Sequence, residues 1–134
     1  DILNKRRENL YYLMDEFKKF YPYLVTIEKE IHEEIGPHAL PIIIQECAKF
    51  TRDHLVHFME KKGIDTRNLF SSMPTQCPGF SFLGYKTGDF PNAEYIGENG
   101  IHIGVHQDLG RKECDYVIDT IEEFLNKNGN IQRN

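Results

Sequence analysis

Two amphipathic segments, one near each end of the chain, most constrain the fold that this sequence can adopt. In the first, apolar residues recur at spacings of three and four, namely Leu10, Leu13, Met14, Phe17 and Tyr21. This spacing predicts a helix over residues 3–20, which Pro22 ends. It also predicts a helix over residues 111–127, with an apolar face of Cys114, Val117, Ile118, Ile121, Phe124 and Leu125. Each apolar stripe requires a further layer to cover it.

Between these helices the chain alternates strand-like and helix-like stretches. Three stretches are β-branched or alternate apolar with polar residues, and predict strands over 39–45, 64–70 and 101–105. A helix with Thr51 as its N-cap and Gly63 after its last turn separates the first two strands. A short helix over 92–99 precedes the third. The predicted fold class is α+β, an α/β sandwich of about three short strands with helices on one sheet face or both.

The size and composition of the chain suit one domain. It has 134 residues, of which 40% are hydrophobic and 28% charged. We expect residues 1–21 to form a linking helix, 22–127 an α/β core and 128–134 a frayed tail. The net charge of −5 argues against a non-specific nucleic-acid binder. No apolar run is long enough to predict a membrane-spanning helix.

The cysteines indicate the expected compartment. Cys47, Cys77 and Cys114 are widely spaced, so they form no disulfide framework and favour a reducing cytoplasm. Cys77 falls in a loop over 71–91 that is rich in Phe and Tyr, and is expected to be the most exposed of the three. A long aromatic loop predicts a surface that packs onto a partner. No adjacent base marks Cys77 as a nucleophile.

The six histidines invite a metal-site hypothesis. His54 and His57 share a predicted helix face, while His102 and His106 share a predicted strand face. No HExxH or paired CxxC motif accompanies them, so no metal ligand is assigned. His106 is expected to end a strand and open a turn, where functional side chains are frequent. A packed structural role for His106 is the alternative.

Arg67 is the second candidate binding residue, placed within a predicted strand. Its guanidinium could form a bidentate contact with a carboxylate or phosphate. The alternative is an ordinary surface ion pair with one of the 21 acidic residues. The chain contains no GxGxxG, GxxxxGK[ST] or GxSxG motif. No catalytic residue is therefore assigned within it.

Several stretches, taken in order, carry a resemblance to a known family. They are RRENL at 6–10, FTRD at 50–53 with FME at 58–60, GIDTRNLF at 63–70, FPNAEYI at 90–96, IGVH at 103–106, and DYVI at 115–118 with EEF at 122–124. Together they resemble the small C-terminal domain of the DegT/DnrJ/EryC1/StrS family of nucleotide-sugar aminotransferases and dehydrases, which use pyridoxal phosphate (PLP). The TRNLF and IGVH stretches look most similar to the CDP-4-keto-6-deoxyglucose 3-dehydrase branch. Residues 71–78 depart from that branch, which shows a GN-containing stretch there.

The resemblance implies the small domain of a fold-type I PLP enzyme. In that family the PLP site lies in a large N-terminal domain, with a Schiff-base Lys in aminotransferases and a His in the dehydrases. The resemblance implies that this chain lacks that domain, binds no PLP itself and is inactive alone. Its expected partners are the missing large domain, a nucleotide-sugar substrate and a second subunit of a homodimer. The start without Met is expected of a piece cut from a longer protein.

The resemblance also bears on the candidate residues and on the function. It implies that Arg67 and His106 contact the substrate in the parent enzyme, with no catalytic, cofactor or metal ligand in this chain. The parent would modify an NDP-4-keto-6-deoxyhexose for polysaccharide or deoxysugar synthesis. One alternative is a stand-alone binding module that kept the fold and lost the chemistry. Another is a histidine-based metal enzyme.

Overall fold

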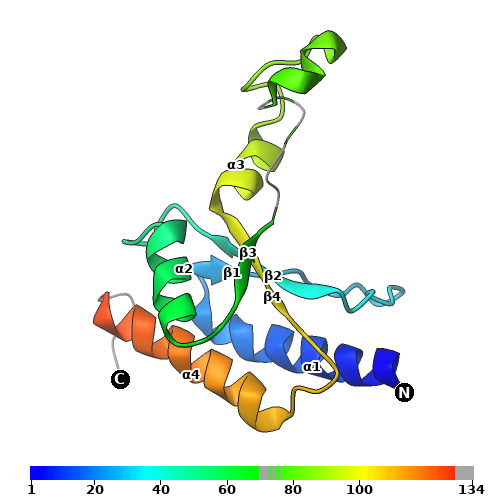
Figure 1. Ribbon diagram of the computed structural model, residues 1–134, viewed down its shortest axis with the longest axis vertical. Coiled ribbons are helices and arrows are strands. Elements are labelled where there is room, and N and C mark those ends of the chain that lie inside the picture. Colours follow the sequence, from blue (N-terminus) through cyan, green and yellow to red (C-terminus); the bar gives the residue numbers. More distant parts are fainter. Residues whose placement is uncertain (70–72, 74, 76, 129–134) are drawn as a thin grey trace.

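The computed structural model describes residues 1–69, 73, 75 and 77–128 (Figure 1). Its elements run in the order α1 (Ile2–Phe17), the 3-10 helix η1 (Lys18–Phe20), β1 (Leu24–Val25), β2 (Ala39–Ile44), α2 (Arg52–Lys61), β3 (Thr66–Asn68), the 3-10 helix η2 (Pro78–Leu83), α3 (Pro91–Asn99), β4 (Gly100–Gly104) and α4 (Arg111–Lys127). None of the helices in these ranges is long and apolar enough to cross a lipid bilayer.

The strands form one four-stranded sheet in the order β1-β2-β4-β3, with every neighbouring pair antiparallel. Side chains alternate between its two faces. The buried face carries Leu40, Ile42, Ile44, Thr66, Ile101 and Ile103. The other face, called the open face below, carries Ala39, Pro41, Ile43, Arg67, His102 and Gly104, all of which are half-buried or exposed. The helices thus cover only one side of the sheet.

The buried face rests on a layer of three helices. In Figure 1, α1 and α4 run side by side beneath the strands, and α2 packs against α4. Phe124 of α4 packs against α2 and the segment before it, because the centre of its ring lies 4.8 Å from that of Phe50 and 5.2 Å from that of Phe58. The apolar stripes predicted for α1 and α4 form much of this core. The α+β class expected from the sequence is therefore confirmed.

Local sequence signals set the helix ends. The hydroxyl oxygen of Thr51 accepts a hydrogen bond from the backbone N–H of His54 at 3.4 Å and begins α2. Gly63 follows α2 with φ +78°, a left-handed conformation that glycine adopts without steric cost. At the start of α4, the Glu113 carboxylate accepts from the Gly110 N–H at 2.7 Å. Turn chemistry therefore positions both helices.

Several sequence-based expectations were wrong in detail. The sheet has a fourth strand, β1, which pairs with β2 but spans only two residues and so has no readable periodicity. The strand predicted over 64–70 is confined to Thr66–Asn68, and β4 ends at Gly104, before His106. Tyr21 was predicted on the buried stripe but is 73% exposed, because the helical geometry stops at Phe20. Residues 129–134 of the predicted frayed tail lie outside the described residues.

The predicted loop over 71–91 is partly structured. Its described part contains η2, which together with α3 projects from one end of the sheet (Figure 1). We call residues 78–90 the aromatic arm. Its exposed apolar side chains are Phe80, Phe82, Leu83, Tyr85 and Phe90. None of the residues of η2 is buried.

Candidate substrate-binding face

Arg67 lies in the middle of β3, an edge strand, and its side chain is exposed on the open face. Its Cα partner on β4 is His102. Across residues 1–69 and 77–128, the Arg67 guanidinium makes neither a hydrogen bond nor an ion pair with another residue. The surface ion pair considered as the alternative is thus not formed there. An unpaired guanidinium on an open sheet face can receive a carboxylate or phosphate.

His102 is a half-buried residue of the open face that the sequence analysis did not assign to a binding site. Its ring stacks on that of His38 with centroids 6.0 Å apart and planes inclined by 30°. Burial lowers the pKa of His102 below the ordinary value, and the neighbouring charges of His38 and Arg67 lower it further. Both effects favour the neutral imidazole. The alternation of His102 with the apolar Ile101 and Ile103 was the signal that could have placed it opposite the core.

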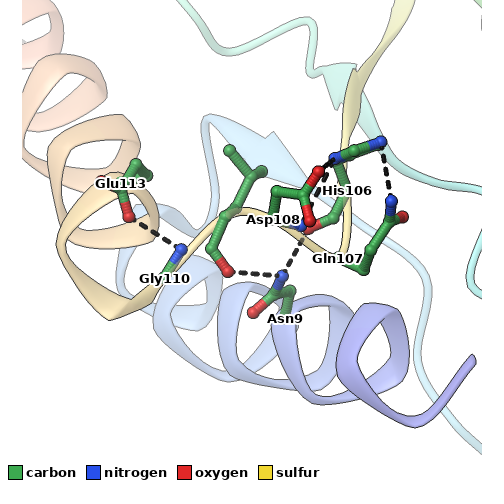
Figure 2. A network of polar contacts seen from close by, with 7 residues as sticks. Asn9, His106, Gln107, Asp108, Gly110 and Glu113 are labelled. Carbon is green, nitrogen blue, oxygen red and sulfur yellow. Dashed lines mark hydrogen bonds and ion pairs between the residues drawn. The ribbon is translucent and has the colours of Figure 1, made fainter. Parts of the chain in front are cut away.

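His106 occupies the turn after β4 rather than the strand itself (Figure 2). Its Nδ1 accepts from the backbone N–H of Asp108 at 3.3 Å, and the Asp108 carboxylate lies 3.4 Å from the same nitrogen. Its Nε2 lies 3.1 Å from the side-chain nitrogen of Gln107. The ring is 56% exposed, so it remains accessible to a ligand. These local contacts orient the ring and stabilise the turn.

The structure places the two predicted binding residues, Arg67 and His106, apart from each other. Arg67 faces His102 across the β3–β4 pair. His102 precedes His106 by four residues in the sequence. No hydrogen bond or ion pair joins Arg67 to His106 within the described ranges. The candidate binding surface is therefore centred on Arg67 and His102. His106 is a separate candidate at the far end of β4.

The remaining candidates stay apart from this surface. His54 and His57 are exposed on α2, and no group of three or more His, Cys, Asp or Glu gathers into a metal-binding arrangement within residues 1–69 and 77–128. Cys47 is exposed whereas Cys77 is half-buried, so the prediction that Cys77 is the most exposed cysteine was wrong. Burial raises the pKa of the Cys114 thiol, which makes that group a poor nucleophile.

The described residues do not fit a PLP site. Every lysine is exposed except the half-buried Lys62, whose ammonium nitrogen lies 2.7 Å from the Glu123 carboxylate. A groove of about 620 Å³ between α1 and β1 contains Lys18, but that ammonium group bonds Asp15 at 2.7 Å. PLP enzymes need a nucleophilic or acid–base residue, a carboxylate at the pyridine nitrogen and a phosphate cradle in one place. The described part of the chain shows no such set.

Comparison with known proteins identifies the family. A profile of the DegT/DnrJ/EryC1/StrS aminotransferase family matches residues 1–122. The chain therefore belongs to this family, as the sequence stretches indicated. It is 34% identical over 98 residues to a dTDP-4-dehydro-2,6-dideoxy-D-glucose 3-dehydratase from Saccharopolyspora spinosa, covering 68% of this chain and 21% of the relative. It is 26% identical over 129 residues to the lipopolysaccharide biosynthesis protein RfbH of Salmonella typhimurium, covering 96% of this chain and 30% of that protein.

Solved structures agree with this assignment. An Escherichia coli GDP-4-keto-6-deoxy-D-mannose-3-dehydratase with bound hydrated PLP is 28% identical, with a TM-score of 0.68 over 87% of this chain and 30% of that one. The sugar aminotransferase CalS13 from Micromonospora echinospora shares the fold, with a TM-score of 0.76 at 17% identity, covering 91% of this chain and 30% of that one. Among the curated relatives, this chain spans from 20% to 33% of their length. The resemblance thus covers one part of much longer proteins.

Proposed function

We propose that this chain is the C-terminal small domain of a PLP-dependent nucleotide-sugar aminotransferase or 3-dehydratase. The substrate would be an NDP-4-keto-6-deoxyhexose, and the product would serve polysaccharide or deoxysugar synthesis. Family membership and two relatives named as sugar 3-dehydratases support this proposal. The observation that carries it is Arg67, which has no hydrogen-bond or ion-pair partner among the described residues and lies on a sheet face that none of the described helix layers covers.

A division of labour between two domains explains the residues that are present. PLP would be bound by a large domain and would supply an electron sink for chemistry at the sugar. Residues of the small domain would close the cleft, exclude water and orient the substrate. Arg67 would hold an anionic part of the substrate through its guanidinium. His106, with its ring fixed by Asp108 and Gln107, would offer a second planar contact.

The missing large domain and a second subunit are the proposed partners. The aromatic arm supports an interface of this kind because Phe82 is 78% exposed and Tyr85 52% exposed. Apolar side chains clustered on a projecting segment mark an interaction surface. The chain alone is expected to be inactive, since it brings together no PLP site in its described residues. The location proposed for the whole enzyme is the cytoplasm.

The first experiment is to sequence the DNA directly upstream of the codon for Asp1. An open frame that continues into a large PLP-binding domain would support the proposal. A Lys at its Schiff-base position would then assign transamination, and a His would assign dehydration. Purified full-length protein should show PLP absorbance and convert an NDP-4-keto-6-deoxyhexose, whereas the 134-residue chain should not. A stop codon and a start site beside Asp1 would refute the enzyme assignment.

A second candidate function is a stand-alone interaction module of the same fold. The exposed aromatic arm is the observation that favours it. The two candidates differ in what they require of the gene, because only the enzyme needs a large domain in the same polypeptide. A free-standing reading frame, together with a folded chain that lacks PLP absorbance, would favour the module.

A further inference from the structure

Three positively charged or protonatable side chains lie in a row across the open face. Arg67 on β3 and His102 on β4 are Cα partners in an antiparallel pair, so their side chains leave the sheet on the same side. The His102 ring stacks in turn on His38, which directly precedes β2. The Arg6 guanidinium of α1 donates to the His38 carbonyl oxygen at 3.0 Å and fixes the backbone at that position. We call Arg67, His102 and His38 the cationic row.

No carboxylate forms an ion pair with this row in the described part of the chain. The ion pairs found there do not include Arg67, His102 or His38. The charged groups that act on His102 from the adjoining segments are His38 and Arg67, and both oppose its protonation. A chain with a net charge of −5 thus keeps a small surface that favours anions.

We propose that the cationic row binds the diphosphate group of a nucleotide, and that His102 takes up one proton from water as the anion binds. The Arg67 guanidinium would donate to one phosphate, and the protonated His102 ring would donate to the next. No covalent bond forms or breaks, and the proton returns to water when the ligand leaves. The assignment to a nucleotide rests on the proposed function, whereas the anion site itself rests on the open face alone.

The arrangement suits a diphosphate better than a carboxylate. A single guanidinium already satisfies one carboxylate through a two-pronged contact. Here the donors continue beyond Arg67 to two imidazole rings, whose centroids are 6.0 Å apart. A row of several donors suits an extended ligand with oxygen atoms at both ends and more than one negative charge. Burial disfavours the protonated His102 ring most, and His38 and Arg67 add repulsion. An anion would offset that repulsion, so protonation and binding favour each other.

The test is to titrate the 134-residue chain with inorganic pyrophosphate, GDP and dTDP at pH 7, using calorimetry and NMR of the histidine side chains. We expect saturable binding and a rise in the pKa of His102 when ligand is present. Arg67→Gln and His102→Gln should each weaken binding at least tenfold. Their matched controls on α2, Arg52→Gln and His57→Gln, should change it less than twofold. The binding heat should depend on buffer ionisation enthalpy, and His102→Gln should abolish that dependence.

Each result bears on one part of the proposal. Glutamate binding as tightly as pyrophosphate would overturn the choice of diphosphate. Pyrophosphate binding without binding of GDP or dTDP would overturn the nucleotide as its source. A His102 signal that does not respond to saturating pyrophosphate would overturn the site, and the domain assignment would stand. Site-specific nucleotide binding in a chain whose gene encodes no large domain would support the site and refute only the proposed enzyme.

Discussion

The side-chain amide of Asn9 donates hydrogen bonds to two backbone carbonyl oxygens, that of His106 at 2.7 Å and that of Leu109 at 3.2 Å (Figure 2). The acceptors lie 97 and 100 residues further along the chain. Asn9 is only 5% exposed. It therefore connects the middle of α1 to the turn that carries His106 and leads into α4. This contact gives Asn9, within the RRENL stretch, a structural role.

Replacing Asn9 with Ala should destabilise the fold. The change leaves two carbonyl oxygens without their donor, and the loss should lower the free energy of unfolding by about 1–3 kcal/mol. Urea denaturation would measure it. Asn4→Ala is the control, because Asn4 is exposed on the same helix and should change stability by less than about 0.5 kcal/mol. Equal effects of the two substitutions would show that the Asn9 contact contributes little.

Gly100 should tolerate no side chain, in contrast to Gly104 on the same strand. A Cβ at Gly100 would lie 2.4 Å from the carbonyl oxygen of Ile96 and 3.0 Å from the Leu69 side chain. A Cβ at Gly104 would meet nothing within 4 Å. Gly100→Ala should therefore cost about 1–3 kcal/mol through overpacking, while Gly104→Ala stays within about 0.5 kcal/mol. Chemical denaturation of both variants would check this, and a neutral Gly100→Ala would contradict the close approach.

The parts of the fold that could be predicted are those with strong local patterns. The last helix was predicted over the residues that α4 occupies, because its apolar spacing persists from Cys114 to Leu125, about three helical turns. Thr51 and Gly63 were placed correctly since cap and left-handed positions depend on local chemistry. β1 escaped prediction because its two residues become a strand only by pairing with β2. Tertiary context, not propensity, creates that element.

The candidate site was less predictable than the fold. Arg67 was selected through the resemblance of the TRNLF stretch, since its place in a predicted strand also allowed an ordinary surface ion pair. His102 was overlooked as a partner of Arg67, since strand register decides which residues face each other and the sequence does not state it. His106 was assigned to a strand because the alternation continues past Gly104, yet the turn begins there. The roles of Arg67 and His106 in substrate binding remain predictions.

Because only one face of β2 is buried, alanine substitutions at two neighbouring positions should lower the free energy of unfolding by different amounts. Ile42 is fully buried among the helices, whereas Ile43 is half-buried on the open face. Ile42→Ala should lower the free energy of unfolding by about 2–5 kcal/mol, because it removes core contacts and leaves a cavity. Ile43→Ala should cost less than half as much. If Ile43→Ala proves as damaging, the open face must be covered in the isolated chain.

An ion-pair cluster around Glu123 of α4 should make the free energy of unfolding depend on pH in the acid range. Hydrogen bonds from Lys127 and Lys62 lower the pKa of Glu123 below its ordinary value. The contribution of Glu123 is therefore present above the unfolded pKa and is lost as pH falls through the folded one. Glu123→Gln should flatten the pH dependence of the unfolding midpoint on the acid side. Asp119→Asn, at an exposed position of the same helix, should leave the profile unchanged. Identical profiles for both variants would exclude the cluster as the cause.

His102 should contribute a second titration of the same sign, at higher pH than that of Glu123. Its pKa is lowered in the folded chain by burial and by His38 and Arg67, so the unfolded chain binds a proton more readily. Stability should accordingly fall as pH drops below the ordinary histidine pKa of 6.5, and this loss should disappear in His102→Gln. His57→Gln, at an exposed position of α2, should retain this loss of stability.

The same titration links stability to the cationic row. Saturating pyrophosphate should restore more stability at about pH 5.5 than at about pH 8, because the ligand favours the protonated ring that the free chain disfavours. Thermal unfolding at the two pH values, with and without the ligand, measures this difference. Equal stabilisation at both values would mean that His102 does not exchange a proton on binding. The remaining contact would then be Arg67 alone, whose charge does not change over this range.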